Sequence, residues 1–499
     1  MTTPSTIAAS DHPLPGRGPA VAALRDALRE PGAIGVCAKE AGVGVASVVR
    51  EAISQWPGPH LRLRDDSETA WRASLLRAVR QLGLPEAELR QPDHPEIGLF
   101  RTLAGRPDAL IRVDRTATLD RLESLRRRLP NARWLITGTP ESIARAGCRW
   151  TLTLDPLPLT SLREAWSSAA TAAAPPGDGS ESLLAALRGL PAAALLARAA
   201  ARLSGATPEL RHFTDASPSS PLLVAARLLW QTLGDGDAAW ALALVACLDH
   251  ERIPTGLLEL GWRSLCEQKQ RANAGELRFA ECLPGELLVS CGDDDGLALP
   301  ASIHAACRAT LPEQLAQAVL GAWASTLPRW SDLAARPEDL ALHAVSLAES
   351  LQSSPETDAA TLAAAVARDH CLAVGAIDRA ADWGRRVIRS EASRHGEESL
   401  AAADAWRSLA AALRFGRRLQ EARSASRSAE AIYDRHPAAA VEVRVAVKCD
   451  IAEADVEEAR AERAVNRLSE ARSLLGAAGD RHSLLLAARV AFLRGAVHL

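Results

Sequence analysis

A glycine-rich turn near the N-terminus has the residue types and spacing that suit phosphate binding. Residues 39–47, KEAGVGVAS, follow an apolar strand-like stretch at 33–38 and open a helical stretch at 48–54. A strand, a glycine-rich turn and a helix together aim backbone N–H groups and a helix N-terminus at one point. The expected chemistry is the binding of phosphate groups, and the expected contacts are Gly42, Gly44 and Ser47.

The turn departs from the phosphate-binding loop GxxxxGK[ST] at the positions that carry charge. In that loop the lysine neutralises the β- and γ-phosphates and the hydroxyl holds Mg²⁺. Here Val45 and Ala46 occupy those two positions, and Lys39 replaces the first glycine. Losing one charged hydrogen bond costs about 1.5–3 kcal/mol. Hydrolysis is therefore expected to be close to absent, and Lys39 is interpreted as a solvated loop residue rather than a displaced substitute.

Two further strand-like stretches end in polar side chains. Residues 109–114 end in Asp114, where a carboxylate would orient Mg²⁺, and the following position is Arg115 instead of a second acid. Residues 133–137 end in Thr137. Carboxyl ends of parallel strands share one edge of a sheet, so Asp114 and Thr137 are expected to face the glycine-rich turn.

These segments belong to an alternation of strand-like and helical stretches over the first 155 residues. Such an alternation predicts a parallel sheet covered by helices. The predicted strands are residues 33–38, 60–63, 109–114, 133–137 and 151–154, and the clearest helices are 68–82 and 119–129.

From residue 156 onward alanine, leucine and arginine dominate, which predicts a mostly helical remainder. A small-residue linker at 167–182 separates it from the sheet. Residues 221–312 combine several helices with two strand-like stretches, 287–291 and 297–299, around the turn GDDDG. Helices that end in a β-ribbon are typical of a winged helix.

A 42-residue repeat follows. Ala380, Ala422 and Ala464 share this step, and so do Val387, Ala429 and Ala471. Large residues precede the small ones, which predicts tetratricopeptide-like hairpins, with an ordinary alanine-rich bundle as the alternative. Residues 483–497 predict the first helix of a further repeat. The expected partner-binding residues are Trp406, Leu413 and Arg414.

Composition and charge exclude several classes of protein. With 47% apolar and 24% charged residues over 499 positions, the chain is globular and multidomain. A net charge of −3 gives no global field for nucleic acid or an acidic membrane. The start of the chain is unlike a secretory signal, and the longest uncharged apolar run, 238–248, is too short to span a bilayer. A cytoplasmic location is expected.

The nine cysteines are scattered without a CxxC motif and fit free thiols in a reducing compartment. Cys282, Cys291, His304 and Cys307 are irregularly spaced. Cysteine is commonly a small buried apolar residue, so no metal site is expected.

The order of these segments resembles the STAND class of signalling NTPases, of the NB-ARC kind, joined to tetratricopeptide repeats. Pro15-Gly16-Arg17 and the following AVAALRDAL resemble the family's motif before the phosphate-binding strand. HLRLRDDSETAWRASLLRAVRQLGL resembles its second strand and helix, and LITGTPES its sensor segment.

The helical part carries further matches. Leu154-Asp-Pro-Leu157 is similar to the segment that leads into the family's helical lid. Gly189-Leu-Pro191-Ala resembles GLPL, which implies that Pro191 contacts the adenine side. Ile303-His304-Ala305 is similar to MHD, whose histidine senses the β-phosphate; its aspartate is missing here. His304 is therefore interpreted as a packed core histidine rather than a working sensor.

The resemblance extends over essentially the whole chain and implies an α/β P-loop NTPase-like parallel sheet domain, followed by all-α winged-helix and tetratricopeptide-like helical repeat domains. Departures at Val45, Ala46, Arg115 and Ala305 all fall on nucleotide-handling positions. The implied divisions are a tail (1–12), a degenerate NTPase-like domain (13–155), a helical lid (156–220), a winged-helix-like domain (221–312), a connector (313–375) and repeats (376–499). The implied remnant nucleotide site comprises Arg17, Gly42, Gly44, Ser47, Asp114, Thr137, Pro191 and His304.

We therefore expect a bacterial regulator with a pseudo-NTPase core that acts as a scaffold. A protein or peptide partner would bind the repeats, and active relatives imply a homo-oligomer. ATP or ADP would bind weakly at most, and Mg²⁺ only with nucleotide. One alternative is slow ATP hydrolysis through backbone amides, Ser47 and Asp114. Another is a transcription regulator, but residues 252–270 have mixed charge and no basic stripe, so DNA binding is not expected.

Overall fold

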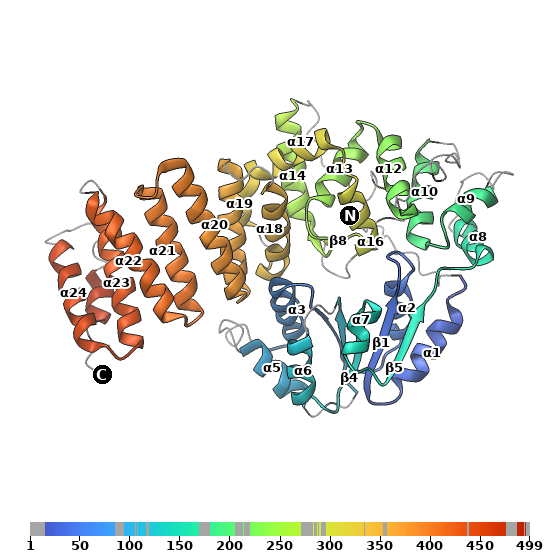
Figure 1. Cartoon of the computed structure of the whole chain (residues 1–499), viewed down its shortest axis with the longest axis horizontal. Helices are drawn as coiled ribbons and strands as arrows, with labels where there is room; N and C mark the ends of the chain where they lie inside the picture. Colours follow the sequence, from blue (N-terminus) through green and yellow to red (C-terminus); the bar gives the residue numbers. More distant parts are fainter. Residues whose placement is uncertain are drawn as a thin grey trace, which may run out of the picture. The chain divides into compact units, whose positions relative to one another are not determined.

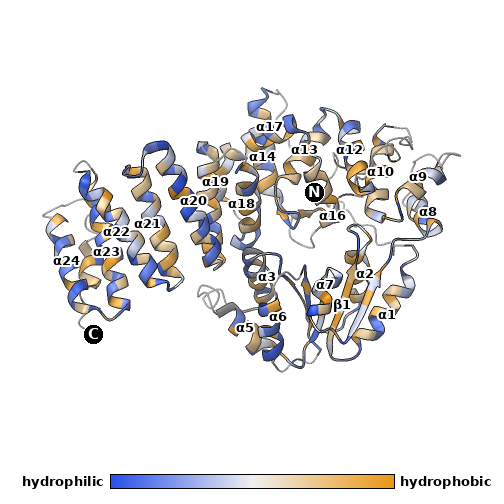
Figure 2. Cartoon of the chain, viewed as in Figure 1, coloured by the Kyte–Doolittle hydropathy of each residue, from blue (hydrophilic) through white to orange (hydrophobic). Residues whose placement is uncertain are grey.

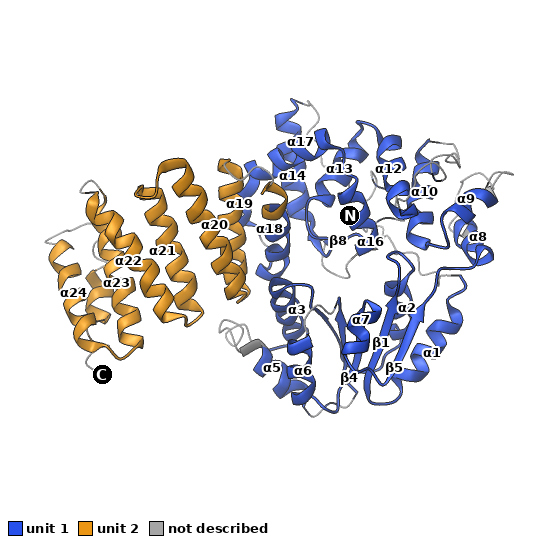
Figure 3. Cartoon of the chain, in the orientation of Figure 1, with its two compact units in different colours: residues 1–347 blue, residues 348–499 orange. Residues whose placement is uncertain are grey.

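The computed structural model consists of two compact units, residues 1–347 and 348–499 (Figure 3). The predicted tail, residues 1–12, and residues 169–179 of the predicted linker lie outside the described residues. The described residues are 15–84, 94–104, 106, 108–115, 119–168, 180–204, 213, 220–270, 283, 287, 289–290, 296–333, 335–352, 357–436, 439–475, 487–493 and 495.

The first unit begins with a five-stranded parallel sheet in the order β2-β3-β4-β1-β5 (Figure 1). This sheet confirms the predicted α/β fold. Because β4 lies between β1 and β3, the carboxyl ends of these three strands are neighbours. The strands are β1 (Gly32–Ala38), β2 (His60–Arg64), β3 (Leu110–Asp114), β4 (Arg133–Gly138) and β5 (Trp150–Leu154).

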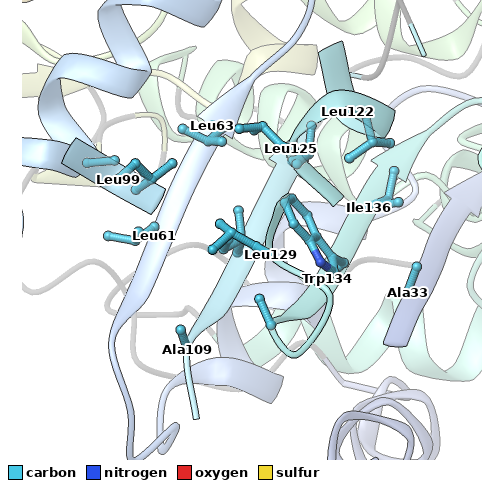
Figure 4. Close-up of a cluster of buried hydrophobic side chains, with 14 of the residues drawn as sticks. Ala33, Leu61, Leu63, Leu99, Ala109, Leu122, Leu125, Leu129, Trp134 and Ile136 are labelled. Atoms are coloured by element: carbon cyan, nitrogen blue, oxygen red, sulfur yellow. The ribbon is translucent and has the colours of Figure 1, made fainter. Parts of the chain in front are cut away.

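Helices cover both faces of this sheet. On one face Leu61 and Leu63 of β2 and Trp134 and Ile136 of β4 join one buried cluster (Figure 4). The helices of this cluster are α3 (Glu68–Gln81), α5 (His94–Leu103), α6 (Leu119–Arg128) and α7 (Pro140–Arg145). The other face is covered by α1 (Gly18–Leu28) and α2 (Val45–Ile53). These two helices pack against each other, α1 against β5 and α2 against β1. Coverage on both faces explains why β1 is hydrophobic along its length (Figure 2).

The rest of the first unit is mainly helical, with a small antiparallel sheet in the order β6-β8-β7. The predicted strand-like stretches at 287–291 and 297–299 overlap β7 and β8. The elements are α8 (Leu159–Ser168), α9 (Ser180–Ala186), α10 (Pro191–Ser204), α12 (Pro221–Leu233), α13 (Asp237–Ala246), β6 (Ile253–Pro254), α14 (Thr255–Gln268), β7 (Val289–Ser290), β8 (Gly296–Ala298), α16 (Ala301–Ala309), α17 (Glu313–Thr326), the 3-10 helix η2 (Leu327–Asp332) and α18 (Pro337–Leu351).

The second unit is built from helical hairpins. Ala380, Ala422 and Ala464 occupy equivalent positions in the second helix of successive hairpins and are at most 2% exposed. A larger side chain would separate the crossing helices, so the small residue is what the 42-residue spacing preserves. The predicted helical repeats are confirmed. The helices are α19 (Asp358–Ala373), α20 (Ile377–His395), α21 (Leu400–Phe415), α22 (Leu419–Arg435), α23 (Val441–Glu457) and α24 (Ala461–Leu475).

Residues 487–493 are helical, within the stretch predicted to begin a further repeat. In the described ranges, no helix combines the length and the apolar character that crossing a bilayer requires.

Candidate functional site

The glycine-rich turn connects β1 to α2. Gly44 caps the N-terminus of α2 with φ at +103°, and Gly42 has φ at +88°. Both values lie in the left-handed region that favours glycine, so these residues let the chain turn directly from strand to helix. Val45 and Ala46 are the first two residues of α2, and Ser47 lies half-buried in its first turn. The position of the missing lysine is therefore at the start of the helix.

Protein groups already bind the backbone of this turn. The Ala192 N–H, next to Pro191 at the start of α10, donates to the Gly42 carbonyl at 3.2 Å. Arg17 is 6% exposed and donates to the carbonyls of Val43 (2.8 Å) and Asp155 (2.6 Å). Burial lowers the pKa of Arg17 despite the nearby Asp155. Arg17, Gly42 and Pro191 thus come together as predicted neighbours, but Arg17 is engaged by the protein's own carbonyls.

Asp114 and Thr137 also meet at the predicted edge of the sheet. The Thr137 hydroxyl donates to Asp114 Oδ1 at 2.8 Å. Two guanidinium groups bind the same carboxylate: Arg112 Nε donates to Oδ1 at 2.7 Å, and Arg62 Nε donates to Oδ2 at 2.6 Å. Burial alone would raise the pKa of Asp114, but Arg112 and Arg62 outweigh it and hold this pKa well below its ordinary value.

This arrangement makes Asp114 an ion-pair partner rather than a ready metal ligand. Both carboxylate oxygens accept hydrogen bonds, and the side chain of Arg112 is only 10% exposed. A magnesium ion at this carboxylate would have to displace these donors and tolerate two positive charges close to it. The geometry therefore opposes binding of a hydrated Mg²⁺ at Asp114.

His304 has a hydrogen-bond partner different from the groups around Asp114. Its Nε2 is 2.9 Å from the Leu248 carbonyl, and its ring centroid is 5.8 Å from that of His250. Burial, followed by the charge of His250, lowers the pKa of His304 to about 4. The ring is therefore neutral near pH 7, and Nε2–H donates to Leu248. This placement fits a packed histidine that ties α16 to the segment after α13.

The three residues predicted to contact a partner have different environments. Leu413 is 2% exposed, and Trp406 packs against the buried cluster that includes Tyr433. Both side chains serve the interior of the repeats. Arg414 lines a groove in the second unit.

An ion-pair cluster that is buried except at Arg62, whose side chain is 46% exposed, escaped the sequence reasoning. It joins β2 and α3 to the segment after α13 and to the start of α18, and every residue in it belongs to the first unit. We define it by Arg62, Arg64, Arg77, Asp249, Glu251 and Asp339.

Arg64 is the centre of the ion-pair cluster. Its side chain is 5% exposed; Nη1 lies 2.9 Å from Asp249 Oδ1 and 3.4 Å from Glu251 Oε2. Arg62 reaches Glu251 at 2.6 Å and also binds Asp114, so the cluster continues into the candidate site. Burial would raise the pKa of Glu251, but Arg62 and Arg64 lower it to about 2. Glu251 is therefore ionised near pH 7 and held by arginines.

A signal for this cluster exists in the alternation of β2. Arg62 and Arg64 lie two residues apart in HLRLR, so they share one face of the strand. In a sheet covered on both sides, a charged face requires partners. The segment Asp249-His250-Glu251 directly follows the apolar run 238–248 and supplies them.

Next to the cluster, Glu338 provides a pH-dependent prediction. Its carboxylate is fully buried, 3.1 Å from Arg80 Nη1, and burial raises its pKa above the ordinary 4.5. A raised pKa in the folded chain means that stability is lost as pH rises from 4.5 through the raised value. Glu338→Gln cannot titrate, so the melting temperature of the variant minus that of the parent should increase between pH 4.5 and pH 8.

Melting curves of both proteins over this pH range measure the difference. The exposed Glu313→Gln in α17 is the matched control, and its difference from the parent should stay flat. Titration of Glu251 and Asp249 is common to all three proteins and cancels. A pH-independent difference for Glu338→Gln would contradict the prediction.

Other titratable clusters do not suggest a metal site. Among the described residues, no group of three or more His, Cys, Asp or Glu side chains is placed to hold a metal ion. Of the four residues weighed for such a site, Cys282 and Cys291 lie outside the described residues. Burial raises the pKa of the Cys307 thiol to about 12.

No protein-family model and no curated protein sequence matches the chain. Similar solved structures include a Signal Transduction ATPase with Numerous Domains (STAND) protein with a tetratricopeptide repeat sensor from Pyrococcus horikoshii. That similarity has 11% identity and a TM-score of 0.39, and it covers 97% of this chain and 83% of that chain. A Walker-type ATPase of Pyrococcus abyssi has 11% identity and a TM-score of 0.32, over 58% of this chain and 95% of that chain.

Proposed function

We propose that this protein is a STAND-like regulatory scaffold whose nucleotide site no longer works and whose helical repeats bind a protein partner. The observation that carries the proposal is the state of Asp114. Arg62 and Arg112 bind its two oxygens, while Val45 stands where a phosphate-binding lysine would be. The carboxylate that would hold Mg²⁺ is thus bound by arginines, and the side chain that would hold the triphosphate is an uncharged valine.

Each replacement opposes catalysis for its own reason. Phosphoryl transfer is catalysed by positioning and by positive charge on the phosphates, supplied mainly by lysine and Mg²⁺. Val45 and Ala46 remove the lysine and the metal-binding hydroxyl, and the arginines on Asp114 compete with the metal. The shape of the turn persists through Gly42 and Gly44. We therefore assign the α/β domain a structural role with no nucleotide turnover.

The ion-pair cluster supports a nucleotide-independent closed state. We interpret α12–α14, the small antiparallel sheet and α16 as a winged-helix-like domain that packs on the α/β domain. In active relatives, the resemblance implies that nucleotide links these parts. Here Arg64 and Arg62 link β2 to Asp249 and Glu251 directly. The closed arrangement therefore needs no ligand.

A partner would then supply the signal. Stacked helical hairpins form extended surfaces that hold peptides and proteins. Without nucleotide exchange, only a ligand with different affinity for the closed and open states can shift the balance between them. The protein that co-purifies from the native host is the candidate for this ligand, acting in the cytoplasm on one chain or on an oligomer.

Titration of the purified full chain with ATP and ADP, with and without Mg²⁺, tests the proposal. We expect no saturable heat or fluorescence change at micromolar nucleotide, so that any dissociation constant is about 1 mM or weaker. Micromolar affinity would contradict the disabled site. So would ATP turnover that Asp114→Asn abolishes, because it would show that Asp114 serves a metal.

A further inference from the structure

The two edges of the five-stranded sheet differ in how they are protected. β2 forms one edge and β5 the other (Figure 1). In a parallel ladder alternate residues direct both N–H and C=O to the same neighbour, so an edge strand turns the groups of every second residue outward. On β2 these include Arg62 and Arg64, because the Asp65 N–H bonds to the Asp114 carbonyl of β3. The Arg64 N–H donates to the Ser74 hydroxyl of α3 at 2.9 Å, so helix contact and charge protect this edge.

The β5 edge lacks both kinds of protection. The Arg149 N–H donates to the Ala33 carbonyl of β1 at 2.9 Å, so the outward residues of this strand are Trp150, Leu152 and Leu154. Within the described residues, their outward N–H and C=O groups have no hydrogen-bond partner. The strand, WTLTL, contains neither a charged residue nor a proline. An edge of this kind is a template for a further strand.

The β5 edge is complementary to a second copy of itself. A two-fold axis requires a surface that matches its own copy. Reversed about Leu152, residues 149–155, RWTLTLD, set apolar residues opposite apolar residues, threonine opposite threonine and Arg149 opposite Asp155. In an antiparallel ladder of this register, Leu152 exchanges hydrogen bonds with Leu152 of the second copy, and Trp150 does so with Leu154. All outward groups of the strand are then paired.

The side chains favour the same pairing. Thr151 and Thr153 are exposed, and Trp150 and Leu152 are half-buried, so a second strand would remove further apolar surface from water. Arg149 forms an exposed ion pair with Glu30 in its own chain. An exposed pair contributes little, so the charges at the two ends of the ladder mainly favour one register. The backbone hydrogen bonds and the apolar contacts hold the copies together.

We propose that two copies of this protein associate through their β5 edges, as an antiparallel ladder centred on Leu152 that joins the two sheets into one. The pairing uses neither the glycine-rich turn nor the repeats. It therefore goes beyond the proposed function, which assigns no surface to an oligomer. A two-fold contact is closed, because each copy has one such edge. The product is a dimer rather than a ring or a filament.

Sedimentation velocity of the full chain without nucleotide measures this association. Between about 1 and 100 µM protein, the mass should rise reversibly from that of one chain to that of two. The mass of a single chain throughout this range would overturn the proposal. A dimer that forms only after ATP is added would also overturn it, because the association would then depend on the nucleotide site.

Paired charge variants test the register. Thr151 lies opposite Thr153 of the second copy, so Thr151→Lys combined with Thr153→Lys places like charges opposite each other. Thr151→Lys combined with Thr153→Glu places opposite charges there instead. Each dimer contains this contact twice, so at low salt the Lys/Lys variant should dimerise about tenfold more weakly than the Lys/Glu variant. Both variants replace exposed threonines, and circular dichroism checks their fold. Equal dimerisation of the two would overturn the proposed register.

A backbone variant tests the ladder itself. Leu152→Pro removes an outward N–H at the two-fold axis, and an edge strand tolerates proline where its N–H faces solvent. The bonds of β5 to β1 come from the alternate residues and remain. We expect at least about tenfold weaker dimerisation for Leu152→Pro. Leu152→Val keeps the N–H and the apolar character and should dimerise like the parent. Unchanged dimerisation by a folded Leu152→Pro would refute the ladder, and the charge variants decide the matter if this variant does not fold.

Discussion

Arg64→Met should destabilise the first unit by about 3–5 kcal/mol near pH 7, the cost of removing one partner from a buried ion pair. Methionine keeps much of the side-chain volume, so the main change is electrostatic. Asp249 and Glu251 would stay buried without the guanidinium that both approach within 3.4 Å. Burial would raise both pKa values, but Arg64 and His250 lower that of Asp249, and Arg62 and Arg64 lower that of Glu251. Without Arg64, Asp249 loses the largest charge that opposes its burial, and Glu251 keeps only Arg62 as its main counter-charge.

The loss should shrink in acid. A lowered pKa contributes stability that is present above the unfolded value and is lost as pH falls toward the folded value. For Glu251 this window runs from 4.5 down to about 2. The parent therefore loses the benefit of the ion-pair cluster over this range, while Arg64→Met has little left to lose. The two proteins should become more alike as the pH falls.

Urea unfolding measures the effect, and hydrogen exchange in β2 and α3 assigns it to the first unit, because a chain with two units need not unfold in one step. Arg29→Met is the matched control. Its pair with Asp26 is 3.3 Å long but 80% and 68% exposed, so little change is expected. A loss of less than about 1 kcal/mol in the free energy of unfolding for Arg64→Met would be no larger than the contribution of an exposed salt bridge. That result would contradict the proposal that the ion-pair cluster links β2 to the segment after α13 without nucleotide.

The strands could be predicted because burial on both faces leaves a continuous apolar stretch. In β3 every residue is buried, although Arg112 and Asp114 are charged. The stretch is therefore recognisable as a strand, but its apolar pattern hides an ion pair between residues i and i+2, Arg112 and Asp114. Strand alternation puts Arg112 and Asp114 on one face, so this contact was accessible from local reasoning. The contact between Thr137 and Asp114 has a different origin, because parallel strands β3 and β4 bring their carboxyl ends to one edge of the sheet.

The longer-range partners were not accessible in this way. Arg64 and Asp249 are 185 residues apart, and Arg77 and Asp339 are 262 apart. Local patterns show that a buried charge needs a partner but not which acid supplies it. The repeats show a related limit. The 42-residue spacing located the small residues, but alanine-rich helices pack on more than one side. The spacing therefore did not show that Leu413, expected to contact a partner, is buried, or that Trp406 is partly buried against the cluster around Tyr433.

Val45→Lys combined with Ala46→Thr should restore ATP binding. Both positions begin α2, directly after Gly44, where an ammonium group can reach phosphates held by the helix N-terminus. One charged hydrogen bond contributes about 1.5–3 kcal/mol, which corresponds to roughly ten- to hundredfold in affinity. Calorimetric titration of the variant against the parent measures the gain. Val45→Leu, which preserves the apolar character, should show none.

Mg²⁺ should add little to this double variant, because Arg62 and Arg112 still bind Asp114. Adding Arg112→Gln releases one interaction with Oδ1 and should make ATP affinity Mg²⁺-dependent. Arg133→Gln removes the same charge at the opposite edge of the sheet, where β4 begins, and should not. A parent that already binds ATP, with little gain from lysine and threonine, would favour the slow ATPase that works through backbone amides, Ser47 and Asp114. If Mg²⁺ already raised the ATP affinity of the double variant that keeps Arg112, the arginines would not block the metal. Loss of the lysine would then be enough to explain the disabled site.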